Sequence, residues 1–89
     1  MKYTKGTIVM MSEQALENYG YSFEGKKFVV THCSTKYMPA KEFFDRGKPE
    51  GYHPGFDETM KGQGLYDLKY LDTGKDLPMS LYDYELYSA

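Results

Sequence analysis

The chain has 89 residues, of which 40% are hydrophobic and 17% aromatic, and its formal net charge is −2 at pH 7. A chain of this length forms one domain and buries only about 60% of the surface that its unfolded form exposes, so its core is small. Acidic and basic residues are interspersed without long runs of one sign, which argues against a surface that binds nucleic acid by neutralising phosphates.

The chain contains a single cysteine, Cys33, and therefore cannot form an internal disulfide. Residues 1–13 lack the apolar length of a signal peptide or of a membrane span. These features predict a protein of the reducing cytoplasm, or of the host cytoplasm if the gene is viral, without a membrane as partner.

Residues 7–11 are rich in apolar and β-branched types and are bounded by a glycine and a serine, which predicts a first strand. Both faces are apolar, with Val9 and Met11 on one and Ile8 and Met10 on the other. Burial of both faces is the more common outcome of such a run. The alternative is an exposed Met-rich face that binds a partner or a second copy of the chain.

Residues 12–20 predict a helix of about two turns, with Ser12 as its N-cap and Gly20 as its left-handed stop. Leu16 and Tyr19 lie on one side of this helix. A helix this short is not stable alone, so we expect it to dock on the sheet through that side.

A second strand is predicted at residues 26–33. Strict alternation places His32 on the face of Phe28 and Val30, and Cys33 on the opposite face. His32 and Cys33 are therefore not expected to bind one metal ion together.

Residues 34–63 form a connection of about thirty residues, far longer than the usual connection of about two to six. Within it, residues 38–47 predict a short second helix, with a proline in its first turn and a glycine at its end. Residues 48–63 mix glycine and proline with aromatic residues and predict an irregular loop, which Tyr52 and Phe56 pin to the sheet.

In the C-terminal third, Tyr66, Leu68 and Tyr70 alternate with charged residues, which predicts a third strand. The elements predicted after it are a turn at 72–74, a returning strand at 77–79, one helical turn at 81–83 capped by Ser80, and a final strand at 84–87. This order predicts a mainly β fold: a small five-stranded barrel with one or two short helices and a long insertion between strands two and three.

His53, Asp57 and Glu58 lie close together in the sequence and carry the donor types of a metal site or of a proton-sharing pair. No second histidine or cysteine lies at a sequence spacing typical of metal ligands. His53 also begins a His-Pro-Gly run that is typical of a turn, so a structural role is favoured. Cys33, at the end of an apolar strand, is typical of an inert cysteine. The sequence predicts no catalytic residue, no metal and no cofactor.

Ten tyrosines are more than a core of this size needs. We expect Tyr66, Tyr70 and Tyr84 in the core. The predicted binding residues are Tyr37, Tyr52, His53, Phe56, Tyr82, Tyr87, Lys41 and Arg46. For the two basic residues, a solvated helix face is the more common explanation.

Four segments follow the strand pattern of a known fold family: residues 6–9 (GTIV), 28–30 (FVV), 64–68 (GLYDL) and 80–86 (SLYDYEL). With them the chain resembles the small SH3-like barrel proteins, especially the short ones that bacteriophages often carry. The resemblance implies the barrel fold and a binding role. SH3 domains that bind proline-rich peptides use a tryptophan, and this chain has none.

We therefore expect a non-enzymatic protein-binding module that uses a tyrosine-lined face and the long central loop, acting on a host component if the gene is from a phage. The alternative is an oligomeric protein that binds or sequesters a small molecule, for instance a nucleotide held between tyrosines by Lys41, Arg46 or Lys48. Another protein is the expected partner, and nucleic acid is not.

Overall fold

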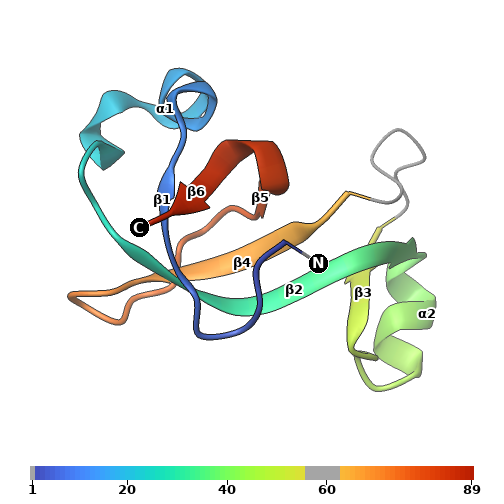
Figure 1. Cartoon of the computed structure of the whole chain (residues 1–89). Coiled ribbons are helices and arrows are strands. Elements are labelled where there is room, and N and C mark those ends of the chain that lie inside the picture. The colour runs from blue at the N-terminus through green and yellow to red at the C-terminus, as the bar shows by residue number, and fades with distance from the viewer. Residues whose placement is uncertain (1, 56–62) are drawn as a thin grey trace.

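The computed structural model describes residues 2–55 and 63–89 (Figure 1). Its elements are, in chain order, β1 (Ile8–Met11), α1 (Glu13–Tyr19), the 3₁₀ helix η1 (Tyr21–Phe23), β2 (Phe28–Met38), α2 (Ala40–Asp45), β3 (Gly51–Pro54), β4 (Leu65–Tyr70), β5 (Leu81–Tyr82), the 3₁₀ helix η3 (Asp83–Glu85) and β6 (Leu86–Ser88). The predicted mainly β class with two short helices is confirmed.

One six-stranded sheet runs in the order β5-β4-β2-β1-β6, and β3 attaches to β2 outside this path. The β2–β3 pairing is parallel, and the other pairings are antiparallel. In Figure 1, β2 and β4 run across the molecule, with α1, β1 and β6 toward one end and α2 and β3 at the other. Among the described residues β5 and β6 are not paired with each other, so hydrogen bonds do not close the sheet into the predicted barrel.

The main core lies under α1 and is built from β1, β2, β4 and β6 with the segments next to them. Val9, Phe28 and Tyr66 are completely buried in it. The predicted helix is confirmed: Ser12 accepts a hydrogen bond from the Ala15 N–H, and the helix ends at Gly20. Because α1 buries Ala15 and Leu16 on this core, packing stabilises a helix that is too short to form alone. Tyr19, which was also expected to dock, stays 38% exposed, so that part of the prediction is wrong.

Only one face of β1 is buried, so the prediction that both faces are covered is wrong. Val9 and Met11 are 0% and 3% exposed, whereas Ile8 is 38% exposed and Met10 is half-buried. The core packs against the Val9 side, and the other face stays open.

A β-bulge in β2 also corrects the predicted side-chain pattern. Val30 lies opposite Leu68 and His32 lies opposite Asp67, so Thr31 is an additional residue, and its hydroxyl donates to the Asp67 carbonyl. The extra residue reverses the alternation beyond it. Cys33, rather than His32, therefore packs against the core.

The long connection is more regular than predicted. β2 continues to Met38, and residues 51–54 form a parallel strand beside it, where an irregular loop was predicted. The second helix is confirmed, although Pro39 is its N-cap and not a first-turn residue. The predicted anchor Phe56 lies outside the described residues.

The return after β4 also differs from the prediction. Residues 77–79 form no strand; the regular pairing comes later, where β5 sets Leu81 opposite Tyr66. Ser80 does not cap a helical turn, because its hydroxyl binds the Asp67 carboxylate. The 3₁₀ helix begins only at Asp83.

Tyr66 ties the N-terminal segment to the sheet. Its hydroxyl accepts hydrogen bonds from the N–H groups of Lys2, at 3.2 Å, and Tyr3, at 3.1 Å. The ring of Tyr3 packs edge-on against that of Tyr66, with 5.4 Å between centroids. Burial, and after it the hydrogen bond to the Asp83 carboxylate, raises the pKa of Tyr66 to about 12. One phenol therefore connects three segments that are distant in the sequence.

The substitution Tyr66→Phe removes this acceptor and leaves the two N–H groups without it. We expect the free energy of unfolding to fall by about 1 to 3 kcal/mol, measured by chemical denaturation. Tyr87→Phe, which removes the hydroxyl of a tyrosine that is 47% exposed, is the control and should change little. Equal losses for the two variants would contradict this role for Tyr66.

Alkaline pH provides a second test of the same contact. Because folding raises the pKa of Tyr66 from 10.0 to about 12, the folded state holds this proton more tightly than the unfolded state does. The resulting stability is fully present below pH 10 and is lost as the pH rises toward 12. The wild type should therefore lose more stability over this range than Tyr66→Phe does; parallel losses would show that Tyr66 is not responsible.

Candidate functional site

The predicted binding residues separate into two groups in the fold. Tyr37, Tyr52 and His53 lie on β2 and β3, beside the helix that carries the two predicted basic residues. Tyr82 and Tyr87 lie on β5 and β6, in the part of the fold that contacts α1 and β1 (Figure 1). Phe56 is outside the described residues. The structure therefore contains two candidate surfaces and not one continuous site.

The first group serves mainly to hold β3 on β2. Tyr37 lies opposite His53 in the parallel register, and the two rings meet edge-on with 5.7 Å between centroids. The ammonium of Lys36 lies 5.7 Å from the centre of the Tyr52 ring. These aromatic side chains are half-buried, so the contacts between strands account for them.

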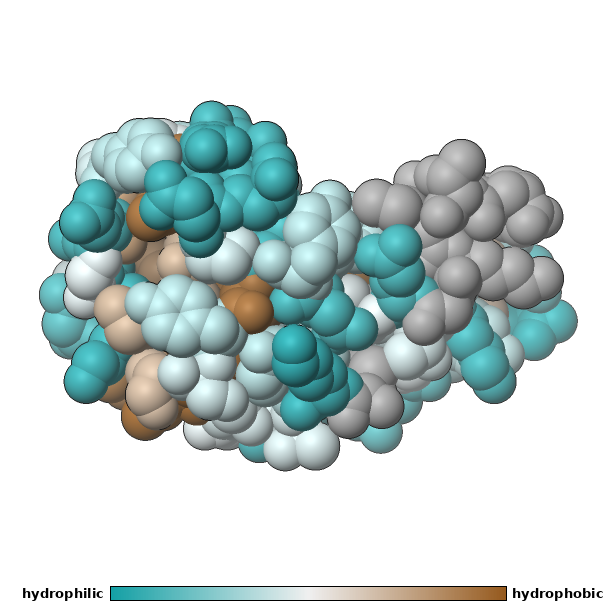
Figure 2. Space-filling model, turned by 45° about the horizontal axis from the view of Figure 1, so that its top comes forward, coloured by the Kyte–Doolittle hydropathy of each residue, from teal (hydrophilic) through white to brown (hydrophobic). Residues whose placement is uncertain are grey.

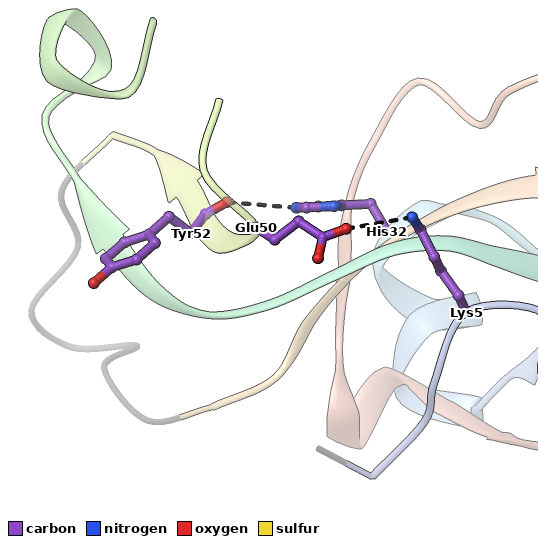
Figure 3. Close-up of polar contacts among 4 residues, drawn as sticks. All are labelled: Lys5, His32, Glu50 and Tyr52. Atoms are coloured by element: carbon purple, nitrogen blue, oxygen red, sulfur yellow. Dashed lines mark hydrogen bonds and ion pairs between the residues drawn. The ribbon is translucent and has the colours of Figure 1, made fainter. Parts of the chain in front are cut away.

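Polar contacts join the same region to the N-terminal loop (Figure 3). A ring nitrogen of His32 lies 3.4 Å from the Tyr52 carbonyl oxygen, and the Lys5 ammonium lies 3.7 Å from the Glu50 carboxylate. The ion pair is exposed to solvent and contributes at most about 1 kcal/mol. A cavity of about 150 Å³ beside it is lined by Lys5, His32, Cys33, Glu50 and Gly51.

His32 and Cys33 both line this cavity, so the structure brings together two residues that the strand pattern had placed on opposite faces. Across the described part of the chain, no group of three or more His, Cys, Asp or Glu residues could hold a metal ion. Cys33 is a free cysteine that is half-buried and packs against the core. Asp57 and Glu58, which were proposed to act together with His53, lie outside the described residues. The combination of the three therefore stays a prediction.

The two predicted basic residues pair with acids of α2: Lys41 belongs to this helix, and Arg46 directly follows it as its C-cap. The Lys41 ammonium lies 2.9 Å from the Asp45 carboxylate, and the Arg46 guanidinium lies 2.7 Å from the Glu42 carboxylate. Both pairs are exposed and span one helical turn. These contacts are those of a solvated helix face, and they do not favour a phosphate site on α2.

The second surface is a cluster of three tyrosines from α1, β5 and η3, which we call the tyrosine cluster: Tyr19, Tyr82 and Tyr84. The rings of Tyr82 and Tyr84 stack with 6.0 Å between centroids and only 4° between planes. Tyr84 is 51% exposed and Tyr19 is 38% exposed. Tyr84 was predicted to be a core residue, and that prediction is wrong because the 3₁₀ helix turns its ring outward.

Burial, followed by the nearby Glu85 carboxylate, raises the pKa of Tyr19, and Tyr84 and Tyr82 add smaller effects. The pKa of Tyr84 is raised as well, by burial and by Glu85. Both hydroxyls are therefore protonated at neutral pH; that of Tyr19 is hydrogen-bonded to Glu85, and that of Tyr84 can donate a hydrogen bond to a partner. Asn18, the neighbour of Tyr19 in α1, is hydrogen-bonded to Glu85, the neighbour of Tyr84 in η3, and this contact brings Tyr19 near the stacked pair.

The tyrosine cluster rests on Glu85, which is 1% exposed. Its carboxylate accepts hydrogen bonds from the Tyr82 N–H at 3.0 Å and from the Asn18 amide at 3.3 Å. Ser12 adds two bonds: its N–H donates to the Glu85 carbonyl and its hydroxyl to the Tyr84 carbonyl, each at 2.9 Å. The start and the end of α1 are thus both fixed to η3.

Apolar surface continues on the outer face of β1 and β6. Tyr87 lies opposite Met10, its hydroxyl lies 3.6 Å from the Met10 sulfur, and it is 47% exposed. Figure 2 shows brown and white side chains at the surface below the mainly hydrophilic α1 at the upper left. The larger share of the exposed aromatic surface therefore lies in the half of the molecule that contains α1, β1 and β6.

Sequence reasoning missed three residues of this surface: Tyr19 as a contact residue, Tyr84 as an exposed one and Glu85 as their support. A signal for Glu85 was present, because an acid three residues after the N-cap, here Tyr82, is typical of a capping box. No comparable signal marks Asn18, whose contact depends on the tertiary fold.

Comparison with known proteins does not add a family to these observations. No protein-family model matches the chain, and searches of curated proteins and of solved structures returned no significant match. Within the described residues, no helix has both the length and the apolar character that crossing a membrane requires.

The support given by Glu85 can be tested with Glu85→Ala. This variant leaves the Tyr82 N–H and the Asn18 amide without their buried acceptor, so we expect a loss of about 1 to 3 kcal/mol in the free energy of unfolding. Faster amide hydrogen exchange at Tyr82 should accompany it. Glu17→Ala, at an exposed position of α1, is the matched control. An Ala variant at Glu85 as stable as this control would contradict the role.

Proposed function

We propose that this chain is a non-enzymatic protein-binding module and that the tyrosine cluster is its main contact surface. The observation that carries the proposal is the exposure of large rings on a fixed support: Tyr84 and Tyr19 remain 51% and 38% exposed although α1 and η3 are bonded to each other. A rigid, partly exposed aromatic group is what a protein partner can cover with little loss of side-chain entropy.

Three properties of the tyrosine cluster support contact with a protein. Tyrosine buries a large apolar area and has few rotatable bonds, and it is enriched among residues that dominate binding energy. The stacked rings of Tyr82 and Tyr84 already restrict each other's motion. Binding of a partner therefore costs these side chains little further conformational entropy. The hydroxyl groups give the surface donors that select a partner's orientation.

We also propose that the fold is related to the SH3-like barrels. The support is the order of the pairings: β1 joins β2 and β6, and β4 joins β2 and β5. A single 3₁₀ turn, η3, separates β5 from β6, which is the order in which SH3-like barrels end. In this proposal, the connection from β2 to β4 adds a second contact region next to β3.

The protein-binding role is tested by capturing partners from a lysate of the organism that encodes the chain. Tyr84→Ala should lose partners that the wild type retains, because it removes the most exposed ring of the tyrosine cluster. Quantitative mass spectrometry of the captured proteins is the measurement. The matched control is Phe44→Ala, which removes a ring that is 57% exposed on α2.

Both variants should unfold at nearly the temperature of the wild type, since neither ring is buried. Tyr84→Phe separates the ring from its hydroxyl and should keep most of the binding. If Tyr84→Ala and the wild type capture the same proteins in the same amounts, the proposed contact surface is wrong.

A further inference from the structure

We infer that the tyrosine cluster binds a partner segment that carries arginine or lysine side chains. This inference rests on the proposed function and adds the chemistry of the partner. It depends on where the fold places the charged residues. The small net charge of −2 gives no information about this distribution.

The charges of the chain are segregated in the sequence. Residues 6–25 and 76–89 contain no lysine or arginine and six carboxylates, whereas the other segments contain all 11 basic residues and the other seven of the 13 acids. The six carboxylates belong to Glu13, Glu17, Glu24, Asp76, Asp83 and Glu85.

The fold brings these two base-free segments together. The first contains β1, α1 and η1, and the second contains β5, η3 and β6. β1 pairs with β6. Ser12, at the start of α1, donates two hydrogen bonds to carbonyl groups of η3, one from its N–H and one from its hydroxyl. Because the tyrosine cluster takes its rings from α1, β5 and η3, it lies entirely within the acidic half of the molecule.

Among the described residues, none of these six acids takes part in an ion pair, although Lys26 lies two residues after Glu24 and Lys75 directly precedes Asp76. The three ion pairs of the described residues all join residues of the other segments, for example Lys5 with Glu50. Glu13 accepts a hydrogen bond from the uncharged Tyr21 hydroxyl at 2.6 Å, and Glu85 is bonded by uncharged donors. Glu17 and Glu24 are exposed.

Several of these carboxylates also act on the exposed rings directly. The pKa of Tyr21, which is 52% exposed, is raised to about 12, first by its hydrogen bond to Glu13 and then by burial, with further effects of Glu13, Glu17 and Glu24. Glu85 raises the pKa of Tyr19 and of Tyr84. Aromatic rings and negative charges therefore occur side by side on this half.

A cationic side chain satisfies both features. The face of a tyrosine ring attracts a cation, and a guanidinium can stack on a ring while its N–H groups bind a carboxylate. Exposed carboxylates within about 8 to 10 Å add long-range attraction at ordinary salt. The same field repels phosphates and acidic peptides, so an anionic ligand such as a nucleotide does not fit this surface.

The test uses the full chain labelled with ¹⁵N and a capped Arg-Gly-Arg-Gly-Arg peptide as probe, with Glu-Gly-Glu-Gly-Glu as the matched control. Amide shifts are followed by NMR at about 50 mM and about 300 mM sodium chloride. We expect the arginine peptide to shift amides of α1, β5 and η3, and to bind several-fold more weakly at the higher salt. The glutamate peptide should shift none of them.

Variants identify the groups responsible. Tyr84→Ala should weaken binding of the arginine peptide about fivefold. The pair Glu17→Gln and Glu24→Gln should weaken it and reduce its salt dependence, whereas Glu42→Gln on α2 should leave it unchanged. The inference is overturned if the glutamate peptide binds the tyrosine cluster as tightly, if the shifts lie on α2 and β3, or if the arginine peptide does not bind.

Failure of this inference and failure of the proposed function give different results. If Tyr84→Ala loses captured proteins while the arginine peptide does not bind the wild type, the surface binds proteins but not through their basic residues. If Tyr84→Ala captures everything that the wild type does, the contact surface itself is wrong, whatever the peptide shows.

Discussion

The buried carboxylate of Glu85 is the contact on which the candidate binding surface depends. It lies between α1 and η3, accepts hydrogen bonds from Asn18 and Tyr82, and is almost completely removed from solvent. A buried charge with fewer partners would be costly, so the donors on both sides have to stay in place. The position of the tyrosine cluster follows, because Tyr19 belongs to α1 and Tyr84 to η3.

The local elements could be predicted from sequence, and their tertiary relations could not. Ser12 and Gly20 mark the ends of α1 correctly because capping is decided by neighbouring residues. Strict alternation failed at Thr31, since a bulge depends on the partner strand. The parallel strand at residues 51–54 was missed because its pairing with β2 has no signature in so short a segment.

The candidate surface was predicted only in part, for the same physical reason. An excess of tyrosine is visible in the composition, but the exposure of each ring depends on the fold. Tyr66 and Tyr82 both occur in the sequence Leu-Tyr-Asp, yet Tyr66 is completely buried and Tyr82 is only half-buried. The two base-free segments can be read from the sequence, but only the pairing of β1 with β6 brings them together. Aromatic exposure, a rigid support and acids without ion-pair partners are the three features on which we base the proposed binding of a basic segment.

The most direct measurement is the solution geometry of the tyrosine cluster itself. The account predicts nuclear Overhauser contacts between the ring protons of Tyr82 and Tyr84, whose ring centroids are 6.0 Å apart. It also predicts slow hydrogen exchange of the Tyr82 amide, which donates a hydrogen bond to the Glu85 carboxylate. Rings without mutual contacts and a Tyr82 amide that exchanges as fast as one in an unfolded chain would contradict it.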